Sequence, residues 1–195
     1  MPSVFLVSDT HFGHAGVCRF THQETETKIR PWTDPNEMDE AMGKMWNETV
    51  RPTDKVYHLG DVVINRKALS ILHRLNGDKV LIKGNHDIFK LEDYLPHFRD
   101  IRAYHVMNNI ILSHVPVHAD SKGRFAGNIH GHLHTNRVMK MHGDVRTDKL
   151  DPWYFNVSVE QTGFKPILFE DVLARMKEQN EKDFVHRDFG EWAGW

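Results

Sequence analysis

The 195-residue chain lacks several features that would place it among secreted, membrane or nucleic-acid-binding proteins. Its one cysteine, Cys18, excludes an internal disulfide and a cysteine-rich zinc site. No apolar stretch approaches the roughly 18 residues of a membrane span, and the apolar run at residues 4–7 is too short for the core of a signal peptide. A net charge of −2 gives no general attraction for a nucleic-acid polymer or an anionic membrane. We therefore expect a cytoplasmic protein with no membrane partner, find no strong signal for a nucleic-acid polymer as ligand, and leave its oligomeric state open.

Histidine is the residue type that stands out, with 15 in the chain. It is the commonest metal ligand and the commonest acid–base residue, so this excess directs attention to where the histidines lie. The rest of the composition, 39% hydrophobic and 27% charged, is that of an ordinary globular protein. The length suits one domain, and no repeat, low-complexity tract or linker divides it. We expect a single domain over residues 1–195.

Five short apolar runs, rich in β-branched residues, are typical of β-strands. They are residues 4–7, 55–59, 79–82, 109–113 and 127–130. Each run is followed at once by Asp, Asn or His side chains. In α/β proteins, ligand sites form outside the carboxyl ends of the strands. The pattern therefore predicts that all five clusters line one site.

The segments around these runs predict helices and a closing strand pair. Helices are expected at 34–50 and 66–77, and a charged helix at 170–184. Residues 153–169 are interpreted as two strands joined by a glycine-containing turn. The aromatic tail at 185–195 has no pattern of its own, and we expect it to pack against the domain.

The donor atoms in the five clusters suit transition-metal ions. They comprise two carboxylates, one amide oxygen and four imidazoles, with no thiolate. Such a mixed set suits Mn, Fe, Zn, Ni or Co better than Ca. Seven ligands are too many for one tetrahedral ion, but they suit two ions that share a bridging carboxylate. We expect two divalent metal ions per chain, with manganese favoured.

The clusters, taken in order, resemble the five signature blocks of the calcineurin-like metallophosphoesterases. The blocks are D-T-H at 9–11, G-D at 60–61, G-N-H-D at 84–87, S-H at 113–114 and G-H-L-H at 131–134. Residues 156–166 also resemble the closing strand pair of small bacterial and phage members. The resemblance implies an α/β fold in which two mixed β-sheets form a sandwich flanked by α-helices, a four-layer αββα arrangement.

The resemblance also assigns a role to each residue of the blocks. The metal ligands are Asp9, His11 and His134 for the first ion, Asn85, His114 and His132 for the second, and Asp61 bridging both. His86 matches the catalytic histidine that contacts the phosphate and protonates the leaving group, and Asp87 matches the residue that orients it. His130 alternates with His132 and His134, but no ligand position remains for it, and we interpret it either as structural or as a residue that supports the ligands.

These assignments predict a binuclear metal-dependent phosphoester hydrolase. Two divalent ions roughly 3.5–4 Å apart would lower the pKa of a bridging water, and the metal-bound hydroxide would attack phosphorus in line with the leaving oxygen. The substrate is a phosphoester, with nucleotides among the candidates. A phosphodiesterase is slightly favoured over a phosphomonoesterase that acts on a small phosphorylated metabolite or nucleotide. The remote alternative is a non-catalytic scaffold that retains the fold.

Basic side chains in two loops beside the clusters are candidates for substrate contacts. The alternative for each is an ordinary solvated or packing role. They are His14, Arg19, Arg30, His118, Lys122 and Arg124.

Overall fold

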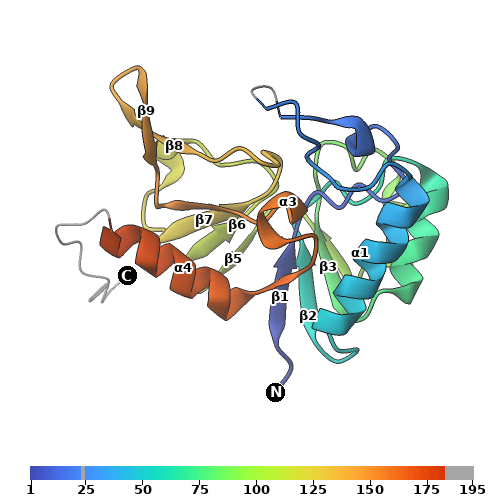
Figure 1. The fold of residues 1–195 in the computed structure, drawn as a ribbon. Coiled ribbons are helices and arrows are strands. Elements are labelled where there is room, and N and C mark those ends of the chain that lie inside the picture. Colours follow the sequence, from blue (N-terminus) through green and yellow to red (C-terminus); the bar gives the residue numbers. More distant parts are fainter. Residues whose placement is uncertain (23–24, 183–195) are drawn as a thin grey trace.

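Two β-sheets form the centre of the computed structural model, which describes residues 1–22 and 25–182 (Figure 1). The first sheet has the strand order β11-β1-β2-β3-β4. Its strands are β1 (Val4–Val7), β2 (Lys55–His58), β3 (Asp78–Ile82), β4 (Asp100–Arg102) and β11 (Ile167–Leu168). Strands β1 to β4 are parallel and β11 is antiparallel to β1, so the carboxyl ends of β1, β2 and β3 lie at one edge.

The second sheet has the order β10-β7-β6-β5. Its strands are β5 (His105–Met107), β6 (Ile110–Leu112), β7 (Gly127–His130) and β10 (Tyr154–Asn156). Strands β6, β7 and β10 are parallel, and β5 is antiparallel to β6. A separate hairpin of β8 (Met139–His142) and β9 (Val145–Leu150) projects from this half of the molecule (Figure 1). Both main sheets are mixed, as the expected fold class requires.

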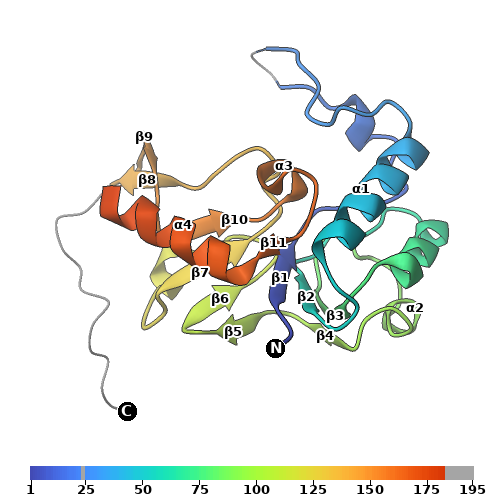
Figure 2. The ribbon, with the colours of Figure 1, turned by 60° about the horizontal axis from the view of Figure 1, so that its bottom comes forward.

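Helices flank the two sheets (Figure 2). They are η1 (Val17–Arg19), α1 (Pro35–Thr49), η2 (Arg66–Arg74), α2 (Leu91–Tyr94), η3 (Ala119–Ser121), α3 (Val159–Thr162) and α4 (Phe169–Lys182). Helix α1 begins as its sequence predicts, because the Asp34 side chain accepts a hydrogen bond from the Asn36 N–H and Pro35 occupies the first helical position. In the described residues no helix combines the length and the apolar character needed to cross a bilayer.

The strands of the first sheet are apolar on both faces because each face packs against a different layer. In β1, Phe5 and Val7 belong to the cluster that includes Trp46 of α1, whereas Leu6 belongs to the cluster that includes Ile129 of the second sheet. Alternate side chains of a strand point to opposite faces, so a strand buried on both sides has a continuous apolar run. The first sheet therefore lies between α1 on one side and the second sheet on the other.

The predicted elements and the structure differ in two places. Residues 153–169 do contain two strands, but the helix α3 separates them and they belong to different sheets, so the expected hairpin is wrong. Gly163, with φ of 71°, ends α3 rather than forming a hairpin turn. The helix expected at 66–77 is the tighter 3₁₀ helix η2. The tail at 185–195 lies outside the described residues.

Candidate metal centre

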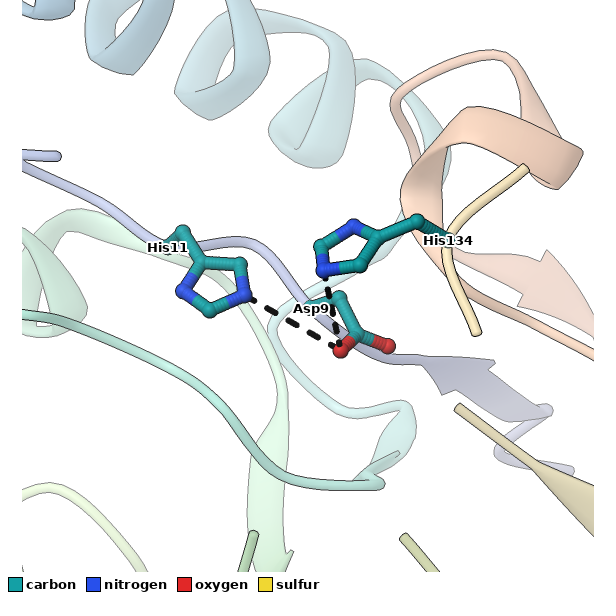
Figure 3. Close-up of side chains that lie close together, drawn as sticks. All are labelled: Asp9, His11 and His134. Atoms are coloured by element: carbon teal, nitrogen blue, oxygen red, sulfur yellow. Dashed lines mark ion pairs between the residues drawn. The ribbon is translucent and has the colours of Figure 1, made fainter. Parts of the chain in front are cut away.

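The loops after β1 and β7 bring three of the predicted ligands together (Figure 3). Asp9, His11 and His134 each offer one ligand atom, and these atoms lie within 4.8 Å of one another. Asp9 Oδ1 lies 4.0 Å from the Nε2 atoms of both histidines. We call these three residues group 1.

A second set of ligands comes from the loops after β2, β3, β6 and β7. Asp61, His114 and His132 also have ligand atoms within 4.8 Å of one another. His114 Nε2 lies 3.3 Å from Asp61 Oδ2 and 2.9 Å from Asn85 Oδ1. Together, these four residues form group 2.

Asp61 faces both groups. Its Oδ2 atom lies 3.7 Å from His11 Nε2 in group 1 as well as 3.3 Å from His114 Nε2 in group 2. Burial opposes ionisation of Asp61, but the hydrogen bond and charge of His114 outweigh it and lower the Asp61 pKa to about 2. Asp61 is therefore a carboxylate at neutral pH, placed where one residue can serve two cations.

The unsatisfied atoms of group 1 fit a bound cation. Asp9 and His11 are almost fully buried, yet Asp9 Oδ1 and both ring nitrogens of His11 have no hydrogen-bond partner among the described residues. Burial raises the Asp9 pKa and lowers the His11 pKa, because both charged forms lose hydration. Buried polar atoms without partners are costly, and a divalent cation would supply the missing partner. The mixed nitrogen and oxygen donors are those that transition-metal ions prefer.

The backbone is strained at five predicted ligands. Their φ angles fall in the left-handed region: Asp9 59°, His11 49°, Asp61 57°, His132 67° and His134 49°. This region is uncommon for residues other than glycine. Each such residue costs on the order of 1–3 kcal/mol, and residues of this kind cluster at functional sites. The clustering supports a functional role for the two groups.

Glycines before two of the ligand loops allow close backbone approach. A Cβ atom on Gly131 would lie 2.5 Å from Asp9 Oδ2 and would collide with Ser8 Oγ. A Cβ atom on Gly84 would lie 2.6 Å from the Asp61 nitrogen. These contacts explain why glycine stands directly before the ligands of two blocks.

Comparison with known proteins identifies the family. The sequence model of the calcineurin-like phosphoesterases matches residues 2–194. The chain belongs to the calcineurin-like phosphoesterase family. It is a phosphoester hydrolase of a metal-dependent family, and the two groups described above are residues that could hold the metal.

Individual relatives match the phosphoesterase along most of its length. An uncharacterized protein of Methanocaldococcus jannaschii is 30% identical over 193 residues, covering 93% of this chain and 94% of the relative. The Gene 66 protein of Mycobacterium phage D29 is 27% identical over 199 residues, covering 83% of this chain and 94% of the relative. A solved structure, a protein of unknown function from Aquifex aeolicus, superposes with a TM-score of 0.65 at 22% identity, over 90% of this chain and all of that one. That structure supports the fold.

His86 lies beside the two groups of the phosphoesterase without belonging to either. Its backbone N–H donates a 2.8 Å hydrogen bond to Asp61 Oδ1, and its exposed ring lies 5.6 Å from the His11 ring. The expectation that Asp87 orients His86 is wrong. The buried Asp87 carboxylate instead accepts hydrogen bonds from the backbone N–H groups of Asp61, Val62 and Gly84. Asp87 therefore holds the Asp61 loop against the loop after β3.

His130 lies outside both groups, as the sequence predicts. It is fully buried, and its Nδ1 lies 2.8 Å from the Gly131 carbonyl oxygen, to which it donates. The G-H-L-H block thus supplies His132 to group 2 and His134 to group 1.

The six candidate substrate contacts divide into two sets. Arg19 lines a groove of about 520 Å³, together with Phe20 and residues 132–136, which include His132 and His134. The His14 ring lies 5.6 Å from the His11 ring. Both side chains lie beside the groups.

The side chains of the other four are engaged by other parts of the protein. A substrate contact by Arg30 is wrong, because its side chain is fully buried and bonded to protein atoms. Lys122 forms a 2.9 Å ion pair with Asp151, and the Arg124 guanidinium lies over the Phe125 ring. The exposed His118 caps η3. In the described part of the chain, no hydrogen bond or ion pair joins Lys122, Arg124 or His118 to a residue of group 1 or group 2.

The sequence patterns did not reveal Glu160 or Ser158, which both contact group 1. Glu160 Oε1 lies 3.0 Å from His134 Nδ1, and Ser158 Oγ donates a 2.8 Å hydrogen bond to Asp9 Oδ2. In the sequence, their segment resembles only a strand pair of other family members, and that resemblance gives neither residue a role. No local pattern relates Ser158 to Asp9, which precedes it by 149 positions.

Proposed function

We propose that the chain is a binuclear metal-dependent phosphoester hydrolase that prefers phosphodiesters. Group 1 would hold one divalent ion and group 2 the other, with Asp61 shared and manganese the favoured metal. The observation that carries this proposal is the position of Asp61 Oδ2, 3.7 Å from His11 Nε2 and 3.3 Å from His114 Nε2. A single carboxylate between two ligand groups is the arrangement that a two-metal site requires.

The chemistry of such a centre follows from charge. Two divalent ions, when bound, lower the pKa of a water between them and offset the charge that develops on the phosphoryl oxygens. The ligands of the chain are held in place before substrate arrives. His114 Nδ1 lies 2.7 Å from the Leu59 carbonyl and His134 Nδ1 lies 3.0 Å from Glu160, so both rings would have Nε2 available to hold an ion.

His86 is placed to donate a proton to the leaving oxygen. Its backbone is bonded to the shared Asp61, while its exposed ring has no hydrogen-bond partner among the described residues. A free ring beside the ligands can contact a substrate oxygen that is not bound to an ion. General acid catalysis by a positioned side chain contributes about 10²- to 10⁴-fold.

The environment of the arginines supports a diester over a monoester. Arg30 donates to the backbone carbonyls of the loop that carries Asp9 and His11, but it is buried and neutralised by Glu160. It is therefore unavailable to a phosphoryl oxygen, and the charge of the substrate would be met mainly by the ions. A phosphodiester carries one negative charge where a monoester carries close to two, so the diester depends less on a further cation beside the ions.

The groove beside His132 and His134 would hold an organic group of the ester. Phe20 is half exposed there and Arg19 lines the same wall. An aromatic face next to a cation suits a nucleotide-bearing ester, because bases stack on aromatic rings and phosphates pair with arginine.

The proposal is tested by assaying metal-free protein reconstituted with Mn²⁺, Zn²⁺, Co²⁺ or Ni²⁺ on an aryl phosphodiester and the matching monoester. We expect metal-dependent hydrolysis, with a higher kcat/KM for the diester. Hydrolysis of the monoester alone would refute the diester preference. No hydrolysis with any of the ions would refute the enzymatic proposal and favour a scaffold.

A further inference from the structure

A buried ion pair lies directly behind group 1. Arg30 and Glu160 are 130 positions apart, and their side chains are essentially inaccessible to solvent. Arg30 Nε and one terminal nitrogen donate to Glu160 Oε1 at 2.8 and 2.6 Å. No sequence pattern predicts that either residue contacts a metal-ligating side chain.

Glu160 controls the ring of a group 1 ligand. The Oε1 atom that accepts from Arg30 also lies 3.0 Å from His134 Nδ1. A carboxylate can only accept, so His134 must carry its proton on Nδ1, which leaves the Nε2 lone pair facing Asp9. This is the tautomer that a metal ligand needs.

Arg30 ties the same carboxylate to the loop that carries the other two ligands of group 1. Its terminal nitrogens donate to the backbone carbonyls of Thr10 at 2.8 Å and Asp9 at 2.6 Å. The pair therefore joins the loop after β1, the loop after β7 and helix α3. In the described part of the chain, no hydrogen bond or ion pair joins Arg30 or Glu160 to group 2.

The charge of the pair matters as much as its geometry. A guanidinium buried beside a cation site repels the cation unless a carboxylate neutralises it, and removing one partner of a buried pair leaves an uncompensated charge. Glu160 is the carboxylate that contacts Arg30. Loss of the Glu160 charge would place an unbalanced cation next to Asp9 and His134.

We propose that the Arg30–Glu160 pair is a positioning device for the first metal ion, with Glu160 both fixing the tautomer of His134 and neutralising Arg30. The inference rests on the proposed two-metal function. It predicts an asymmetry: variants of Glu160 weaken metal binding at group 1 and spare group 2.

The test is a titration of the metal-free full-length protein with Mn²⁺. The titration measures the number of ions bound per chain and the affinity of each binding step. Electron paramagnetic resonance reports whether two bound Mn²⁺ ions are magnetically coupled. We expect Glu160→Gln and Glu160→Ala to lower the Mn²⁺ affinity of one binding step about 10- to 100-fold. The affinity of the other step should not change, and the signal of coupled Mn²⁺ ions should be lost. The double variant Arg30→Met/Glu160→Gln should regain part of the Glu160→Gln loss, although the bonds from Arg30 to the Asp9 and Thr10 carbonyls stay lost. It removes the unbalanced charge, while glutamine still accepts from His134.

The chain offers a matched control in the Arg74–Glu40 pair, which has an N–O distance of 2.7 Å but is exposed and, among the described residues, has no hydrogen bond or ion pair to a predicted metal ligand. Glu40→Gln should bind two Mn²⁺ ions as the wild type does. Circular dichroism in EDTA checks that each variant folds, and if Glu160→Ala does not fold, the near-isosteric Glu160→Gln and the double variant still decide.

Two coupled Mn²⁺ ions bound to Glu160→Gln with wild-type affinity, or equal weakening of both steps, would overturn the positioning proposal. A double variant as weak as Glu160→Gln would overturn its charge component. If the wild type binds two ions and hydrolyses the diester while Glu160→Gln does the same, only this inference fails. A wild type that binds fewer than two ions would refute both this inference and the proposed function.

Discussion

The fully buried His58 should make the protein sensitive to acid. Its Nε2 lies 2.9 Å from Thr10 Oγ1, and the Thr10 hydroxyl already donates to the Val62 carbonyl. His58 Nε2 must therefore carry the proton, which leaves Nδ1 as the basic atom, buried and without a partner among the described residues. Burial accordingly lowers the His58 pKa to about 3.

The sign and size of the effect follow from proton linkage. Between pH 6.5 and 3 the unfolded chain holds a proton on His58 and the folded chain does not, so stability falls as the pH falls. The limiting slope is about 1.4 kcal/mol per pH unit. Between pH 7.5 and 4.5 the loss from His58 alone is about 2–3 kcal/mol.

The assay compares wild type with His58→Gln, which keeps a polar group near Thr10 but does not titrate. Urea unfolding of metal-free protein, followed by tryptophan fluorescence, gives the free energy of unfolding at several pH values. The variant should lose about 2–3 kcal/mol less than the wild type between pH 7.5 and 4.5. His130, whose pKa burial lowers to about 4, titrates in both proteins and cancels in the comparison. Identical pH slopes for the two proteins would refute the reasoning.

Three further substitutions test other parts of the site. His86→Ala should still bind two Mn²⁺ ions but lose about 10²- to 10⁴-fold in kcat on an alkyl leaving group, with a much smaller loss on a nitrophenyl ester; full turnover of the alkyl ester would contradict the acid role. Gly131→Ala should cost about 1–3 kcal/mol of stability and weaken one Mn²⁺ step, because its Cβ would meet Asp9 and Ser8; unchanged unfolding and Mn²⁺ titrations would show that the loop adapts. Arg19→Gln should raise KM about two- to fivefold for a dinucleotide substrate but not for an aryl diester. Equal changes in KM for the two substrates would show that Arg19 does not contact the nucleotide.

The positions of the five strands along the chain, and the clusters that follow them, could be predicted because their signals are local. Runs such as 4–7 and 127–130 are strands with the same bounds in the structure. The polar clusters that follow the strands come together because the carboxyl ends of parallel strands meet at one edge. The expected separation of His132 from His134 also matches the two groups.

The contacts around the ligands could not be predicted, because they depend on tertiary proximity. The sequence predicts that Arg30 is a cation in an exposed loop. In the structure Arg30 is buried, because Glu160 of α3 lies next to the loop after β1 and pairs with it. The same helix replaced the turn expected between 153 and 169. Asp87 follows His86 in the chain, but its carboxylate is taken by three backbone N–H groups instead. The family resemblance therefore misassigned one contact, and no sequence pattern indicated the other.

The central claim is that two ions act together through Asp61. The most direct test measures the rate of aryl phosphodiester hydrolysis as Mn²⁺ is added stepwise to metal-free protein, with Asp61→Ala in parallel. We predict little hydrolysis after one equivalent, a rise to full rate at the second, and no metal-dependent hydrolysis by Asp61→Ala, because both ions lose a ligand. Full activity at one equivalent, or an active Asp61→Ala variant, would contradict the two-metal account.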